Sequence, residues 1–157
     1  MQTWSDGLGR RWEIRLTFGA RQLIKSRTSQ DVLLIDSDLE TLERFGADIE
    51  LIADCAWILC ESQATKRDIS MESFSEGLTD EAFVSFRDVL MGEIAVFLQC
   101  LQPERGERLR VAIEAIKKAG AELMTLQTES AQNLIDLLSS ESTSLSDTST
   151  SLQESSA

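Results

Sequence analysis

The clearest pattern in the chain is a strict alternation of polar and apolar residues near its start. In residues 11–18 every second residue is apolar, which is the period of a β-strand with one buried face. The apolar face carries Trp12, Ile14, Leu16 and Phe18. Residues 6–9 have the composition of a turn, and residues 1–4 can supply a returning strand. The pattern predicts an N-terminal β-hairpin.

Helical spacing replaces the alternation after the hairpin. Residues 20–26 predict a short helix that turns Leu23 and Ile24 inward. Residues 31–36 are a run of four apolar residues between two acids, too short for its period to separate helix from strand. We expect an extended or one-turn segment there, packed on the core.

Capping residues mark the next two helices. Ser37, with Glu40 three residues later, forms a capping box and predicts a helix that Gly46 breaks or re-caps. Asp48 is placed to cap a helix over residues 49–66. The apolar stripe of that second helix is wide, so we expect it to be the central helix of the core.

Three further helices are predicted beyond residue 66. Ser70 and Thr79 bracket a short one, and apolar residues at steps of three and four predict a longer one over residues 80–101. Pro103, the one proline, should interrupt that helix and begin another, because its missing N–H costs little in the first turn.

The last predicted helix has a heptad pattern. From residue 104, one set of positions recurs at alternating steps of four and three, which over four heptads gives about 50 Å of helix. These seam positions are Leu109, Ile113, Ile116, Gly120, Leu123, Gln127, Ser130, Leu134 and Leu137. Gly120, Gln127 and Ser130 at the centre of the seam offer little apolar surface, which argues against a strong self-standing coiled coil. An intramolecular seam, a homo-oligomer and a docking helix for a partner remain equal alternatives.

Together these elements predict an α+β fold that is mainly α. We expect a hairpin and helical core in residues 1–102, a long helix in residues 103–138, and a disordered tail in residues 139–157, where twelve of nineteen residues are Ser or Thr. The candidate partner-binding residues lie on the long helix: Leu109, Ile113, Ile116, Leu123, Leu134 and Leu137.

Charge divides the chain unevenly. The net charge is −12, which argues against a general nucleic-acid binder, yet residues 1–30 carry six basic and two acidic residues. We expect the hairpin's arginines to pair with the acidic helices, with an acidic partner as the alternative. A base-stacking surface made by Trp4, Trp12 and Phe18 beside the arginines is the less favoured interpretation.

Residues that usually carry chemistry are scarce. The chain has no histidine, the commonest general base and a frequent metal ligand. Cys55 and Cys60 lie about 140° apart on their predicted helix, which favours buried structural thiols, and Cys100 has no histidine partner. The acids at residues 36–40 fit helix capping better than a cation loop. We therefore predict no catalytic residue, no cofactor and no metal.

Cysteine number and hydropathy bear on location. Three cysteines suggest no complete disulfide framework, and no run of about eighteen apolar residues predicts a membrane span. We expect a protein of the reducing cytoplasm.

The order of these features resembles a known group of proteins. The relevant segments are Asp-Gly followed by Gly-Arg-Arg-Trp-Glu-Ile-Arg-Leu-Thr at residues 9–17, the apolar patch at 31–36, Ala-Trp-Ile-Leu at 56–59, and Ile-Ser-Met-Glu-Ser-Phe at 69–74 before a Phe-rich helix. Over about residues 4–100 the chain resembles small proteins encoded among phage and prophage tail genes, especially tail assembly chaperones.

The resemblance implies a role without catalysis. Members of that group are thought to coat the hydrophobic tape-measure protein and to recruit tail-tube subunits, so the implied partner is a tape-measure-like or tail-tube protein in the host cytoplasm. A first alternative is a structural subunit or adaptor retained in a larger particle, with its hairpin added to a neighbour's sheet edge. An enzyme using Asp/Glu chemistry is the second.

Overall fold

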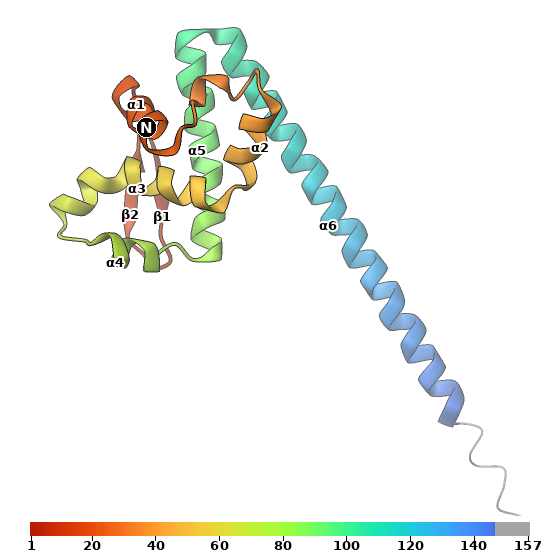
Figure 1. Cartoon of the computed structure of the whole chain (residues 1–157). Coiled ribbons are helices and arrows are strands. Elements are labelled where there is room, and N and C mark those ends of the chain that lie inside the picture. Colours follow the sequence, from red (N-terminus) through yellow and green to blue (C-terminus); the bar gives the residue numbers. More distant parts are fainter. Residues whose placement is uncertain (147–157) are drawn as a thin grey trace, which may run out of the picture. The chain divides into compact units, whose positions relative to one another are not determined.

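The computed structural model describes residues 1–146, with side chains described up to residue 139. It divides into two compact units, Met1–Ile113 and the residues from Glu114 on. The first unit joins a two-stranded hairpin to a set of helices, and the second continues the last helix (Figure 1). The predicted class, α+β and mainly α, is confirmed.

The hairpin pairs β1 (Gln2–Ser5) with β2 (Arg11–Ile14) in antiparallel register, Trp4 opposite Trp12. Along the second strand and just beyond it, the alternation buries Trp12, Ile14 and Leu16 as predicted. The predicted position of Phe18 is wrong, because β2 ends earlier and Phe18 starts a helix with 56% of its surface exposed. Thr17 causes the change by accepting a hydrogen bond from Ala20 N as the helix N-cap.

Seven helical segments follow the hairpin in the described residues. They are α1 (Phe18–Thr28), the single 3₁₀ turn η1 (Val32–Leu34), α2 (Leu39–Ala47), α3 (Ile49–Lys66), α4 (Met71–Glu76), α5 (Asp80–Leu101) and α6 (Pro103–Ser146). The predicted bounds of α3 and α5 and the start of α6 at Pro103 are confirmed. The start of α3 depends on a local rule, because Asp48 caps the helix by accepting a hydrogen bond from Leu51 N.

Other boundaries differ from the prediction. Asp38 caps α2 in place of Ser37, by accepting a hydrogen bond from Thr41 N, and Gly46 lies inside that helix. In α1, Ile24 is buried but Leu23 is 44% exposed, since neighbouring residues differ by about 100° around a helix. The predicted disordered tail is helical in residues 139–146, and its remainder, 147–157, lies outside the described residues.

Aromatic rings fill the space between the hairpin and the helices. Trp4 stacks on Trp12 with ring centroids 6.4 Å apart, and Phe74 of α4 meets Trp12 edge-on at 5.0 Å. Phe86 of α5 meets Trp4 at 5.2 Å. Residues from four separate elements thus form one buried cluster, with β1 lying against α5 and β2 against α3 (Figure 1).

A buried carboxylate fixes the hairpin turn to this cluster. Asp6 accepts hydrogen bonds from Trp12 Nε1 at 2.9 Å and from the side chain and backbone N–H of Arg10. Burial acts to raise the pKa of Asp6, but these hydrogen bonds hold it below its usual range. Arg10 also donates to the carbonyl of Ser73 at 2.8 Å, and Gly7 N donates to the carbonyl of Gly77. The turn is therefore bonded to α4 and to the residue that follows it.

The basic residues at the start of the chain find most of their partners nearby. Arg10 pairs with Asp6, and both Arg21 and Lys25 pair with Asp31. Arg27 reaches Glu61 of α3 at 3.0 Å. Arg27 of α1 therefore pairs with an acidic helix, whereas Arg10 of the hairpin pairs with Asp6 inside the hairpin itself.

The beginning of α6 packs against the end of α5 without room for a side chain at residue 106. A Cβ atom on Gly106 would lie 2.4 Å from the Cβ of Gln99 and 2.5 Å from its Cα. Leu109 is 1% exposed and belongs to the core. The first turns of α6 are therefore an integral part of the first unit.

We expect Gly106→Ala to destabilise the first unit by about 1–3 kcal/mol, because Gln99 backbone atoms must move. Gly120→Ala is the matched control on the same helix, since nothing lies within 4 Å of its added Cβ. Urea unfolding followed by tryptophan fluorescence measures both. Equal midpoints for the two variants would contradict the packing described.

Candidate functional site

Exposed apolar side chains gather on α6 in the second unit. Every described side chain from residue 114 to 139 is exposed. Eight of them are large and apolar, with 55–70% of their surface accessible: Ile116, Leu123, Met124, Leu126, Leu134, Ile135, Leu137 and Leu138. We call this set the α6 apolar face.

The α6 apolar face covers about half of the helix circumference. At about 100° per residue, the arc from Leu126 to Ile135 spans about 180°, with Ile116 and Leu134 at its centre. Polar side chains occupy the other half: Glu122, Thr125, Glu129, Gln132 and Asp136. This face is wider than the seam of a two-stranded coiled coil, so it can contact more than one neighbouring helix.

The six predicted partner-binding residues divide between the two units. Ile116, Leu123, Leu134 and Leu137 are exposed on the α6 apolar face. Leu109 is buried in the first unit and Ile113 packs against the same core, so these two contribute to the packing of the first unit. The seam spacing continues unchanged across residue 113, and spacing alone therefore cannot show where burial ends.

Sequence reasoning missed four residues of the face. Met124, Leu126, Ile135 and Leu138 lie beside the seam rather than on it. The sequence does indicate them, because each is a large apolar residue next to a seam position. A search for a broad apolar arc, in place of a strict heptad, would have found them.

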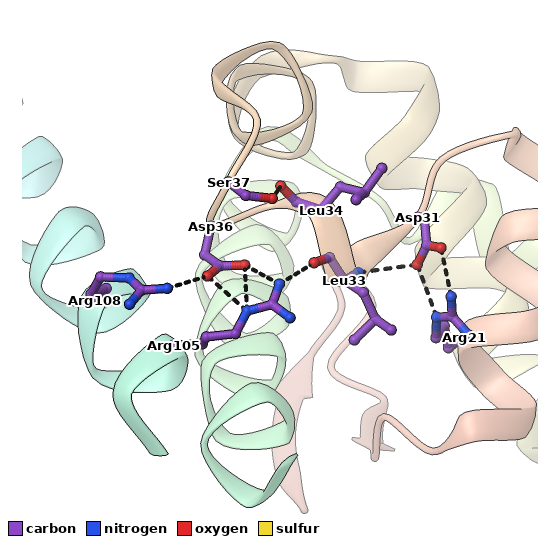
Figure 2. Close-up of polar contacts among 8 residues, drawn as sticks. All are labelled: Arg21, Asp31, Leu33, Leu34, Asp36, Ser37, Arg105 and Arg108. Atoms are coloured by element: carbon purple, nitrogen blue, oxygen red, sulfur yellow. Dashed lines mark hydrogen bonds and ion pairs between the residues drawn. The ribbon is translucent and has the colours of Figure 1, made fainter. Parts of the chain in front are cut away.

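A second buried carboxylate fixes the first turns of α6 within the first unit. Asp36, whose side chain is 1% exposed, accepts hydrogen bonds from Arg105 Nε at 2.9 Å and from Arg108 Nη2 at 3.2 Å (Figure 2). Arg105 also donates to the carbonyl of Leu33. Arg105 is the main reason that the pKa of Asp36 lies below its usual range.

Two of the three acids at residues 36–40, Asp36 and Asp38, bind groups of the protein itself. Asp38 caps α2, and Asp36 is neutralised by the two arginines of α6. Across the described part of the chain, no group of three or more Cys, Asp or Glu side chains could hold a metal ion.

The two tryptophans of the hairpin are not available to stack on bases. Trp4 and Trp12 are 3% and 0% exposed, and the exposed Phe18 of α1 meets Phe97 of α5 edge-on at 5.3 Å. Arg10 is bound to Asp6. The structure thus gives these residues a packing role.

The outer edge of β2 is covered by side chains of α3 and of the residue that follows it. Glu13 N donates to Gln63 Oε1 at 3.1 Å, and Gln63 Nε2 donates back to the carbonyl of Glu13 at 2.5 Å. Arg67 donates to the carbonyl of Arg11 at 2.7 Å. The backbone groups that an added strand would need at these positions are occupied.

The cysteines differ in access. Cys55 and Cys60 are buried, as predicted, and burial raises the pKa of each thiol to about 12. Cys100 is exposed on α5. All three are free thiols.

No family model, curated protein or solved structure matches this chain. Within the described residues, none of the helices combines the length and the apolarity needed to cross a membrane. Any function must therefore be inferred from the chain's own residues.

Asp36→Asn should lower the free energy of unfolding by about 1–3 kcal/mol at pH 7, because Arg105 loses its buried ionic partner. A depressed carboxyl pKa stabilises the fold above its unfolded value of about 3.9, and this stability is lost as the pH falls through the folded pKa. The difference between wild type and variant should therefore shrink below about pH 4. Urea unfolding at pH 7 and pH 3 measures it.

The exposed Asp54→Asn serves as the control for this experiment and should match the wild type at pH 7. If the difference in free energy of unfolding between the wild type and Asp36→Asn stays constant down to pH 2, the ionic contribution is ruled out.

At pH 8 a thiol reagent should modify the native chain once, at Cys100, and three times after unfolding, because the buried thiols remain protonated. Mass spectrometry counts the adducts. The Cys100→Ser variant should give none in the native state, and rapid native labelling of Cys55 would contradict the burial.

Proposed function

We propose that this protein binds other proteins and has no catalytic activity. Its α6 apolar face receives apolar helical segments of a partner and masks them, in the manner of a tail assembly chaperone. One observation supports the proposal above the others, namely eight large apolar side chains exposed along one helix face.

The physical basis is the cost of leaving this face in water. Fully burying one Leu, Ile or Met side chain is worth about 1.5–3 kcal/mol, so a partner that covers several of the eight gains a large association energy. Contiguous apolar patches on proteins mark interaction sites. An amphipathic helix that meets a complementary apolar surface is a common recognition mode.

The setting that we propose is the assembly of a phage-tail-like particle. The partner is a tape-measure-like or tail-tube protein, and the place is the cytoplasm, that of the host if the chain is viral. Three free cysteines suit a reducing compartment. Nucleic acid and membrane are not partners in this proposal, in keeping with the net charge of −12.

The alternative role is a structural subunit or adaptor that stays in the particle. Gln63 and Arg67 already occupy the outer edge of β2, which speaks against strand addition there. Mass spectrometry of purified particles separates the roles, because a chaperone is absent from them and a subunit is present in fixed stoichiometry.

We expect co-expression to keep a tape-measure-like protein in the soluble fraction. Leu126→Glu should abolish this effect, because it places a charge within the α6 apolar face. Thr125→Glu is the matched control, since it adds the same charge at the preceding residue on the polar half. Quantitative immunoblotting of soluble and pelleted partner measures the result.

A partner that pellets equally with and without the wild-type chain would refute the chaperone role. Equal loss of solubility with the two variants would show that added charge matters and the face does not.

A further inference from the structure

We propose that a second copy of this chain pairs with the first along α6, in antiparallel orientation. The paired positions are the α6 seam, which we define as Gly120, Leu123, Gln127, Ser130, Leu134 and Leu137. The inference rests on the proposed binding role of this helix and adds that the binding unit is a homodimer.

The α6 seam is self-complementary about a point between residues 128 and 129. In an antiparallel pair centred there, Leu123 lies opposite Leu134 of the second copy, and Gln127 lies opposite Ser130. Polar side chains then meet polar ones at the centre, and leucines meet leucines on both sides. A polar seam residue that pairs with another fixes the register of such a pair.

The outermost layer of the pair fits by size. Gly120 lies opposite Leu137 of the second copy, and nothing lies within 4 Å of the Cβ position of Gly120. The smallest residue of the seam thus faces a large one. Gly120, Gln127 and Ser130 offer little apolar surface in a single helix, but in the pair each faces a residue of matching size or polarity.

Charge does not oppose a second copy on the α6 seam. Among the described side chains of the second unit, the acids Glu114, Glu122, Glu129 and Asp136 lie on the polar half of α6. The like charges of two copies therefore stay away from the contact.

The pair leaves apolar side chains free for a partner helix. Met124, Leu126 and Leu138 flank the α6 seam and lie at the borders of the two-helix contact. Two helices side by side form a groove lined by such flanking residues. The width of the α6 apolar face is thereby explained, since its centre binds the second copy and its margins bind the partner.

Sedimentation of the full chain, of 17.5 kDa, tests the pairing directly. The wild type should sediment as a dimer at micromolar concentration, and Leu123→Glu should be monomeric with an unchanged near-ultraviolet spectrum of its buried tryptophans. Thr125→Glu, on the polar half, should remain dimeric. A wild type that is monomeric at all concentrations, or that forms a larger oligomer, would overturn the proposal.

Disulfide trapping in a Cys100→Ser background tests the orientation. Leu123→Cys chains alone should not cross-link, because the two residues 123 lie about 16 Å apart along an antiparallel pair, too far for a disulfide. A mixture of Leu123→Cys and Leu134→Cys chains should cross-link. Cross-linking of Leu123→Cys alone, or none in the mixture, would contradict antiparallel pairing.

Failure of this inference can be told from failure of the proposed function. A monomer that still keeps the tape-measure-like protein soluble refutes the pairing alone. A dimer that leaves this partner insoluble upholds the pairing and refutes the chaperone role. Leu126→Glu should stay dimeric while losing the partner, since Leu126 flanks the seam.

Discussion

The packing of Trp4 and Trp12 against Phe74 and Phe86 is the contact on which the first unit depends. It joins both strands to α4 and α5, two helices that lie far from the strands in the sequence. Large aromatic rings bury much apolar surface at little cost in side-chain entropy. Asp6 completes the cluster, because its carboxylate accepts a hydrogen bond from the buried indole N–H of Trp12.

In the second unit, by contrast, the large apolar side chains of α6 remain exposed to water. Leu109 is buried in the first unit, yet Ile116, seven residues later in the same heptad pattern, is 58% exposed. In proteins, most of the stability of a helix comes from packing its apolar face against other elements. A second copy along the α6 seam and a partner at its margins would supply that packing.

Local rules made much of the fold predictable. Alternation predicted the hairpin, and a capping aspartate and a proline marked the starts of α3 and α6. Long-range contacts were not predictable. Nothing near Asp36 in the sequence indicates that Arg105, sixty-nine residues later, is its partner.

The candidate site shows the same limit. Heptad spacing found four exposed residues of the α6 apolar face, but it also included Leu109 and Ile113, because burial against the first unit leaves no mark in the spacing. Phe18 was misplaced for a related reason. Its alternation continues that of β2, and the capping bond at Thr17 overrides it.

Hydrogen exchange along α6, measured over a range of protein concentrations, tests the central claim most directly. If the α6 apolar face binds a second copy or a partner protein, amides of residues 114–138 become more protected as the concentration of the chain, or of an added tape-measure-like protein, rises, while protection of the first unit stays constant. Fast exchange in residues 114–138 that is independent of concentration, and unchanged by an added tape-measure-like protein, would contradict it.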